Sequence, residues 1–374
     1  MHILLSILIF NICFVSCSSL KKLNDRIVTP SRETKTFTPQ WRKNLDPAYL
    51  SGNVPIHLNG PISVDEQVFI GSSNKGFLSI NEKSGEVLWR IDEDEAYNSL
   101  PVSLQRSIIY GTESGRVFSR KMVNGELNYE IDLGASVDGT PIVSNGRLFV
   151  QLRNHQIFAL DAITGKILWS YKKPVTNKTT IQGVGKGFVR DNKVIFGFAD
   201  GDLIAFRVES GDILWDKKVG KRVDKFMDLN WDMVEYNGAL VITDAAGHIY
   251  FLKFKDGEIF HQMDLAISTN LVVFDDFIYF GDLNGGFNRL DKSYDPAKLV
   301  RPSNRSLTRV GRWGRRFVVG DINGLVSIIS DKGREIEGQK VLGNDLSALF
   351  TSPQTGDLGG LIMFTSRGRL YYYR

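Results

Sequence analysis

One pattern constrains the fold of this 374-residue chain more than any other: a unit of about forty residues recurs along most of its length. The unit is clearest in Ala159–Trp169 and Ala205–Trp215, where an apolar run, a turn ending in Thr-Gly or Ser-Gly and a second apolar run follow one another. A repeated unit buries its apolar faces only against neighbouring copies of itself. We therefore expect one repeat architecture and not the two domains that this length would otherwise suggest.

Glycines in the turns define the period. The glycines that close the second turn of each unit are separated by 40, 40, 46 and 46 residues, at Gly85, Gly125, Gly165, Gly211 and Gly257. The glycines of the first turn continue further along the chain, at Gly76, Gly115, Gly201, Gly247, Gly285, Gly324 and Gly368, with Asn154-His155 standing in once. Glycine suits such turns because their last position needs a positive φ. The period is that of a propeller blade.

Each unit reads as a series of hairpins built from apolar and β-branched runs, and a short fourth strand such as 139–144 precedes the first turn. Four antiparallel strands per unit and eight first turns predict an all-β, eight-bladed β-propeller. The second turn is irregular in units six and seven, which carry Tyr294-Asp295-Pro296 and Asp331-Lys332-Gly333. A seven-bladed propeller is therefore the alternative.

The two chain ends are expected to close the ring. The last unit stops at 369–373, before its outermost strand, whereas 38–46 contains Trp41 and follows no hairpin. This N-terminal strand is predicted to complete the last blade, because an open ring would expose unpaired sheet edges. The aromatic residues four positions after the second-turn glycines are predicted to pack between blades: Trp89, Tyr129, Trp169 and Trp215.

The N-terminus indicates export. Residues 1–14 are almost wholly apolar, and Ser16-Cys17 ends a segment typical of a lipoprotein signal. We expect a signal peptide at 1–16, a lipidated Cys17 with a flexible linker at 17–36, and the propeller at 37–374. The alternatives are a buried N-terminal strand for the apolar run and an unmodified Cys17 in an ordinary signal peptide. Cys13 and Cys17 are the only cysteines, so the folded part has no thiol for a disulfide or a metal.

No catalytic chemistry is evident. The 46 basic and 42 acidic residues nearly balance, which gives no reason to expect nucleic acid as a partner. His57, His155, His248 and His261 lie in different units without the spacing of metal ligands. The segments 282–285 and 321–324 resemble fragments of a calcium loop but are better interpreted as aspartate-capped turns. We predict no metal, no cofactor and no enzyme activity.

The segment Leu160–Trp169 and its copies resemble the repeat of the PQQ-type propellers, which include quinoprotein dehydrogenases and non-catalytic proteins. Within this group the lipoprotein signal, the single propeller and the ending on the last blade's third strand are similar to the BamB family of outer-membrane assembly lipoproteins. That resemblance implies a lipid-anchored protein on the periplasmic side of the outer membrane. Its implied role is to hold the periplasmic domains of a BamA-like barrel protein and to aid insertion of unfolded outer-membrane clients.

The resemblance also implies a partner surface, on loops that join the outer strand of one blade to the inner strand of the next. These loops correspond here to 176–186 and 223–232. The implied partner-binding residues are Thr180, Ile181, Gln182, Asp228, Leu229 and Asn230. Asn230 replaces the second aspartate of the family's D-x-D motif, and Gln182 stands where an arginine is expected.

The strongest local charge bias is in 301–316. This stretch has no acidic residue and six arginines, at positions 301, 305, 309, 312, 315 and 316. It is either a site for anionic lipid or an acidic partner, or a solvated rim balanced by Asp282, Asp291 or Asp321. Two other functions stay open for the whole chain: an exported propeller that binds another protein or a glycan at the envelope, and a PQQ-dependent dehydrogenase.

Overall fold

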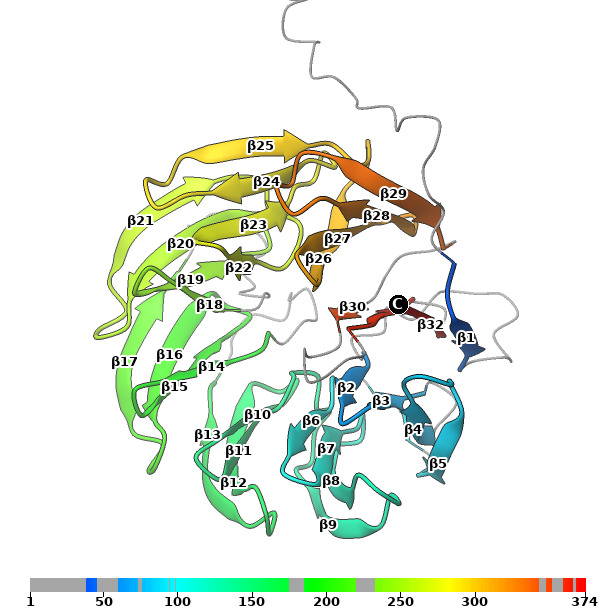
Figure 1. The fold of residues 1–374 in the computed structure, drawn as a ribbon. Helices are drawn as coiled ribbons and strands as arrows, with labels where there is room; N and C mark the ends of the chain where they lie inside the picture. Colours follow the sequence, from blue (N-terminus) through cyan, green and yellow to red (C-terminus); the bar gives the residue numbers. More distant parts are fainter. Residues whose placement is uncertain are drawn as a thin grey trace, which may run out of the picture.

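The chain forms a ring of eight blades around a central axis (Figure 1). The computed structural model describes residues 38–45, 60–72, 76–93, 95–97, 99–174, 185–219, 233–342, 348–351, 359–365 and 368–374. Each blade is a four-stranded antiparallel sheet. The predicted eight-bladed β-propeller is therefore confirmed, and the seven-bladed alternative is wrong.

Blades 1 to 4 follow one another along the chain. Blade 1 contains β2 (Ile62–Val64), β3 (Gln67–Gly71), β4 (Gly76–Asn81) and β5 (Val87–Asp92). Blade 2 contains β6 (Val102–Leu104), β7 (Ser107–Gly111), β8 (Arg116–Lys121) and β9 (Leu127–Asp132). Blade 3 contains β10 (Ile142–Ser144), β11 (Arg147–Gln151), β12 (Gln156–Asp161) and β13 (Ile167–Lys172). Blade 4 contains β14 (Phe188–Arg190), β15 (Lys193–Gly197), β16 (Asp202–Arg207) and β17 (Ile213–Lys218).

Blades 5 to 8 complete the ring. Blade 5 contains β18 (Val234–Tyr236), β19 (Ala239–Thr243), β20 (His248–Lys253) and β21 (Ile259–Asp264). Blade 6 contains β22 (Val272–Phe274), β23 (Phe277–Gly281), β24 (Phe287–Leu290) and β25 (Pro296–Val300). Blade 7 contains β26 (Leu307–Trp313), β27 (Arg316–Asp321), β28 (Leu325–Ile329) and β29 (Ile336–Val341). Blade 8 contains β30 (Ala348–Thr351), β31 (Leu361–Phe364), β32 (Arg369–Tyr373) and β1 (Trp41–Asn44).

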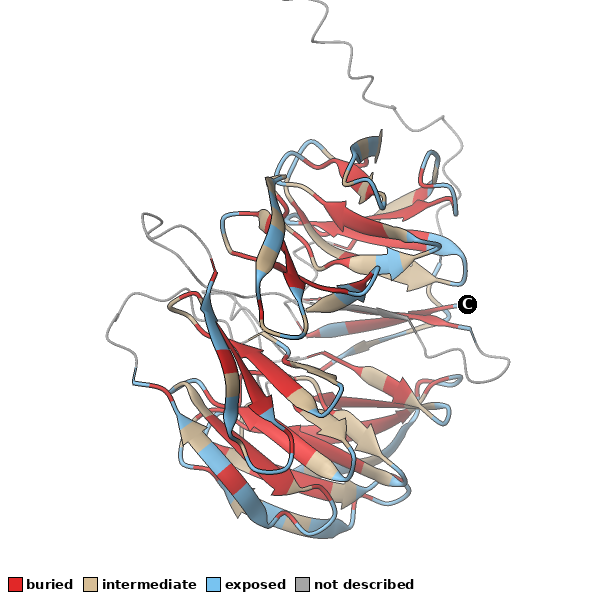
Figure 2. Cartoon of the chain, turned by 90° about the vertical axis from the view of Figure 1, so that its left-hand side faces the viewer, coloured by how far each residue is buried: buried red, intermediate tan, exposed pale blue. Residues whose placement is uncertain are grey.

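The apolar core lies between blades. The two middle strands of a blade are buried on both faces, as in β3 and β4, whereas outer strands such as β5 alternate between exposed and half-buried residues (Figure 2). One cluster joins Phe149 and Ala159 of blade 3 to Phe196 and Phe206 of blade 4. Because such clusters are shared by neighbouring blades, each blade depends on the next for its burial.

The N-terminal strand closes the ring as predicted. In Figure 1 the blue β1 lies beside the red β32, and the two strands pair antiparallel with Trp41 opposite Tyr372. The backbone N–H of Gln40 donates to the carbonyl of Tyr372 at 2.8 Å, and that of Leu45 donates to Gly368 at 2.8 Å. The two ends of the chain therefore share one sheet.

Aromatic residues of the outer strands lock blades 1 to 4 to the blade that follows each of them, as expected for Trp89, Tyr129, Trp169 and Trp215. The indole N–H of Trp89 donates to the carbonyl of Met122 in blade 2 at 2.8 Å. Its ring lies so close to Gly125 that a Cβ there would be 2.9 Å from a ring carbon. The equivalent bonds at the following junctions run from Tyr129 to Ala162, from Trp169 to Val208 and from Trp215 to Phe254. Trp41 makes the same contact at the closure, donating to the carbonyl of Glu82 at 2.7 Å.

In blades 6 and 7 the second turn keeps its positive-φ geometry, although different residues form the turn and its contacts. Tyr294 takes the place of the second-turn glycine at φ 60°, and His261 of blade 5 stacks on its ring with centroids 4.2 Å apart. In blade 7 Gly333 has φ 73° and contacts Leu299. The repeat therefore changes in sequence at these blades without losing the contact between them.

The close contact between Trp89 and Gly125 can be tested with a matched pair of variants. Gly125 and Gly134 both have positive φ, 74° and 81°, but an added Cβ meets Trp89 at Gly125 and nothing within 4 Å at Gly134. Gly134→Ala should cost about 1 kcal/mol of unfolding free energy, from backbone strain alone. Gly125→Ala should cost about 2–4 kcal/mol, because the indole must also move. Urea unfolding measures both free energies, and equal losses would show that the Trp89 ring does not require a glycine at position 125.

Candidate functional site

The strand order gives the ring two distinct faces. One face carries the turns between the second and third strands of each blade together with the connections from each outer strand to the next blade; we call it the connection face. The other carries the turns between the first and second strands and between the third and fourth strands; we call it the hairpin face. Antiparallel pairing within every blade fixes this division.

The predicted partner loops begin and end on the connection face. The first leaves β13 at Lys172 and returns at β14, and the second leaves β17 at Lys218 and returns at β18, so they occupy consecutive junctions. The predicted contact residues lie outside the described residues: Thr180, Ile181, Gln182, Asp228, Leu229 and Asn230. The predicted signal peptide and Cys17 lie outside them as well.

One ion-pair cluster joins the two described segments that lead into these loops. The Lys173 ammonium contacts both oxygens of Asp200, at 2.7 and 2.9 Å, and also Asp202. Lys218 pairs with the same Asp202 at 2.9 Å. Lys173 is buried and also lies 5.0 Å from the centroid of the Phe198 ring. Burial alone would raise the pKa of Asp200, but the hydrogen bond and charge of Lys173 outweigh it and lower that pKa.

His155 stands beside this cluster in an unusual conformation. It has φ 63°, which is left-handed backbone, at the turn position where blade 2 and blades 4 to 8 carry glycine. Its ring lies 6.4 Å from that of Phe198, and burial lowers its pKa, so the imidazole is neutral at neutral pH. In the sequence, Asn154-His155 replaces the glycine of the first turn. In the structure, this replacement places the His155 ring beside the segment that leads into the first loop.

The other described histidines, His248 and His261, each contact residues of their own or the next blade. Nδ1 of His248 lies 2.8 Å from the Asp244 carboxylate, which also accepts a bond from the Tyr250 hydroxyl at 2.8 Å. His57 lies outside the described residues. Within the described ranges, no three His, Cys, Asp or Glu side chains gather as a possible metal site.

The segments that resemble calcium-loop fragments are aspartate-capped turns, as predicted. Oδ1 of Asp282 accepts bonds from the backbone N–H groups of Asn284 and Gly286, both at 2.8 Å. Oδ1 of Asp321 does the same for Asn323 and Leu325, both at 2.9 Å. These carboxylates therefore serve the turns themselves.

Two arginines of the arginine-rich stretch pair with acids other than those proposed from the sequence. Arg315 pairs with Asp275 at 3.1 Å, and Arg316 pairs with Glu337 at 2.7 Å. The Arg312 guanidinium lies 3.3 Å from the centroid of the Phe274 ring. The expectation that Asp282, Asp291 or Asp321 would balance the stretch is wrong for these arginines, because the acids that face them come from neighbouring strands and turns. Asp291 instead caps its own turn, accepting a bond from the Ser293 N–H at 2.8 Å.

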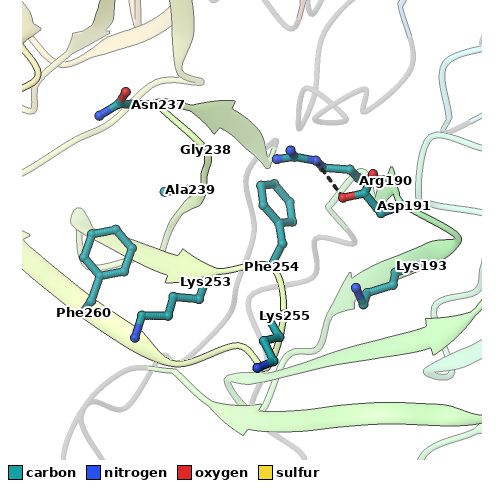
Figure 3. A pocket seen from close by; sticks show the side chains of 10 residues that line it. All are labelled: Arg190, Asp191, Lys193, Asn237, Gly238, Ala239, Lys253, Phe254, Lys255 and Phe260. Atoms are coloured by element: carbon teal, nitrogen blue, oxygen red, sulfur yellow. Dashed lines mark ion pairs between the residues drawn. The ribbon is translucent and has the colours of Figure 1, made fainter.

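The hairpin face contains a hollow of about 410 Å³ between blades 4 and 5, which we call the blade 4/5 hollow (Figure 3). It is lined by Arg190, Asp191, Lys193, Asn237, Gly238, Ala239, Lys253, Phe254, Lys255 and Phe260. The sequence analysis did not predict this hollow. Two residues that depart from the repeat, the small Ala239 and the large Phe254, are the sequence features that could have indicated it.

Among the residues that the structure describes, no helix has the length and apolarity to cross a membrane.

Comparisons with known proteins agree on one family. The family described as "Outer membrane protein assembly factor BamB" matches residues 74–294, more than half of the chain. The relative of that name in Yersinia pestis is 27% identical over 227 residues, which cover 56% of this chain and 54% of that protein. The one in Burkholderia pseudomallei is 22% identical over 96% of this chain and 94% of that protein.

Two further similarities were found, one to a sequence and one to a solved structure. A quinone alcohol dehydrogenase subunit of Gluconobacter oxydans is 37% identical over 93 residues, 24% of this chain and 12% of that protein. The crystal structure of BamB from Moraxella catarrhalis superposes with a TM-score of 0.75 at 18% identity, covering 91% of this chain and all of that one. The match to the family and the eight-bladed fold together show that the chain belongs to the BamB family of PQQ-repeat β-propellers.

Proposed function

We propose that this chain is a non-catalytic scaffold lipoprotein of the machinery that assembles β-barrel proteins in the outer membrane. Cys17 would carry the lipid that holds it there, facing the periplasm. The propeller would bind the periplasmic domains of a BamA-like barrel protein and aid insertion of unfolded clients. Family membership and the relatives named as outer-membrane assembly factors support this proposal.

The observation that carries the proposal is that one ion-pair cluster anchors two consecutive connections between blades. Lys173 and Lys218 each lie a few residues before one predicted loop, and both contact Asp202. A cluster shared in this way ties together the two described segments that lead into the loops on the connection face. Such preorganisation reduces the ordering cost of binding a partner. The proposed contacts are Thr180, Ile181, Gln182, Asp228, Leu229 and Asn230.

A quinoprotein dehydrogenase is the less favoured function. Its metal would need free carboxylate oxygens, yet Asp282 and Asp321 direct theirs to turn amides and to Asn288 and Ser303. The similarity to a quinone dehydrogenase also covers only 24% of this chain.

The scaffold role can be tested by affinity purification of the full chain from detergent-solubilised envelope. A barrel protein of the outer membrane should co-purify, and Asp228→Arg with Leu229→Ala should reduce its yield to about a tenth, as for loss of an interface hot spot. The control is Glu209→Arg, an exposed residue on the hairpin face of blade 4. Absence of any barrel protein from the unaltered sample would refute the proposal, and recovery of another envelope protein or a glycan would favour the alternative.

The anchoring cluster makes a separate prediction through Lys173→Met. Loss of the ammonium leaves Asp200 and Asp202 without their buried cation, so at pH 7 the unfolding free energy should fall by about 2–3 kcal/mol. The depressed pKa of Asp200 contributes stability above its unfolded value of about 3.9, and that contribution is lost as pH falls through the folded pKa. The difference between variant and parent should therefore shrink below about pH 4.

Urea unfolding at a series of pH values measures this difference. Lys172→Met is the control, because Lys172 is the exposed neighbour of Lys173. A Lys173→Met penalty that is absent at pH 7, or that does not depend on pH, would show that the cluster does not stabilise the loop anchors.

A further inference from the structure

The blade 4/5 hollow exists because two positions of blade 5 depart from the repeat. The first residue of the second strand is Ala239, the smallest at that position; the other blades carry Gln67, Ser107, Arg147, Lys193, Phe277, Arg316 and Leu361. In the outer turn, Phe254 takes the place of Glu82, Met122, Ala162 and Val208, which are all buried. Phe254 is only half-buried. A short side chain thus opens the space and a large ring forms one wall.

The cations around the hollow are unequally neutralised. Arg190 pairs with Glu235 at 2.6 Å and with Asp191 at 3.1 Å, and its guanidinium lies 4.3 Å from the centroid of the Phe254 ring. Lys253 pairs with Glu258 at 2.6 Å. Lys193 and Lys255 form no ion pair with any residue in the described ranges. The lining therefore offers two uncompensated ammonium groups.

Apolar surface adjoins these charges. The Phe260 side chain, which lines the hollow, is 44% exposed. In Figure 3 the side chains of Lys253, Lys255 and Lys193 are spread along one side of the hollow instead of meeting at one point, with Phe254 and Phe260 above them. A single phosphate needs donors that converge on it, whereas carboxylates spaced along a chain suit separate lysines.

We propose that the blade 4/5 hollow is a docking site for an acidic segment of a protein partner, in which carboxylates alternate with apolar side chains. The carboxylates pair with Lys193 and Lys255, and an apolar side chain packs on Phe260. A volume of about 410 Å³ accommodates a few such side chains. The site is independent of the proposed function, because it lies on the hairpin face, opposite the connection face. The propeller would then hold two partners at once.

The test uses a fluorescein-labelled ten-residue peptide in which aspartate alternates with leucine and phenylalanine, and the same peptide with asparagine for aspartate. Fluorescence anisotropy with the full chain should show binding of the acidic peptide, weakened by salt, and roughly tenfold weaker binding of the asparagine peptide. Lys193→Glu with Lys255→Glu should weaken the acidic peptide by about tenfold or more.

Two controls separate a site from general attraction to a basic surface. Lys83→Glu with Lys166→Glu makes the same change in net charge on the hairpin face of blades 1 and 3, where both lysines are exposed, and should leave binding unchanged. Ala239→Gln introduces the residue of blade 1 and fills the hollow without changing charge, so it should also weaken binding by about tenfold. Thermal unfolding checks that each variant folds.

Three results would overturn the proposal: no binding of the acidic peptide to the unaltered chain at about 1 mM, equal losses in the two double lysine variants, or full binding by a folded Ala239→Gln. None of them bears on co-purification of a barrel protein, which depends on the connection face.

Discussion

The contact between an outer-strand aromatic and the turn glycine of the next blade holds this ring together. Trp89, Tyr129, Trp169 and Trp215 each donate to a carbonyl in the following blade while the ring covers a glycine that has no Cβ to obstruct it. Trp41 repeats the contact between the last blade and the first. Because each blade buries its apolar side chains against its neighbours, these contacts and the closing strand make the stability of every blade depend on the completed ring.

A closed ring suits the proposed role of a scaffold that binds other proteins. The sheets are fixed by the fold, whereas the turns and connections between their strands can vary in sequence. The strands that support these turns and connections are already ordered before a partner binds. Two features around blade 4 lie on opposite faces of the ring. Lys173 and Lys218 tie together the starts of two connections on one face, and Ala239 and Phe254 open a hollow on the other. The two proposed binding sites would therefore use separate surfaces of the ring.

The fold could be predicted from the sequence because its determinants repeat. A glycine and an aromatic residue four positions apart mark the outer turns of blades 1 to 4, and Trp41, which follows no hairpin, indicated the closing strand. Features that depend on contacts between blades could not be predicted. The acids that face Arg315 and Arg316, the cluster around Lys173 and the blade 4/5 hollow all join residues that are brought together only by the register of neighbouring sheets. His155 was visible as an exception in a turn, but its position beside Phe198 was not.

Hydrogen exchange at the closing strand tests the account most directly. The amides of Gln40 and Leu45 donate to carbonyls of Tyr372 and Gly368, although more than three hundred residues separate the partners. If the ends of the chain close the ring, the peptide that contains Trp41–Asn44 should exchange as slowly as the outer strand of blade 3, Ile167–Lys172. Exchange of that peptide at the rate of an unstructured chain, with blade 3 protected, would contradict the closed propeller on which the proposed functions depend.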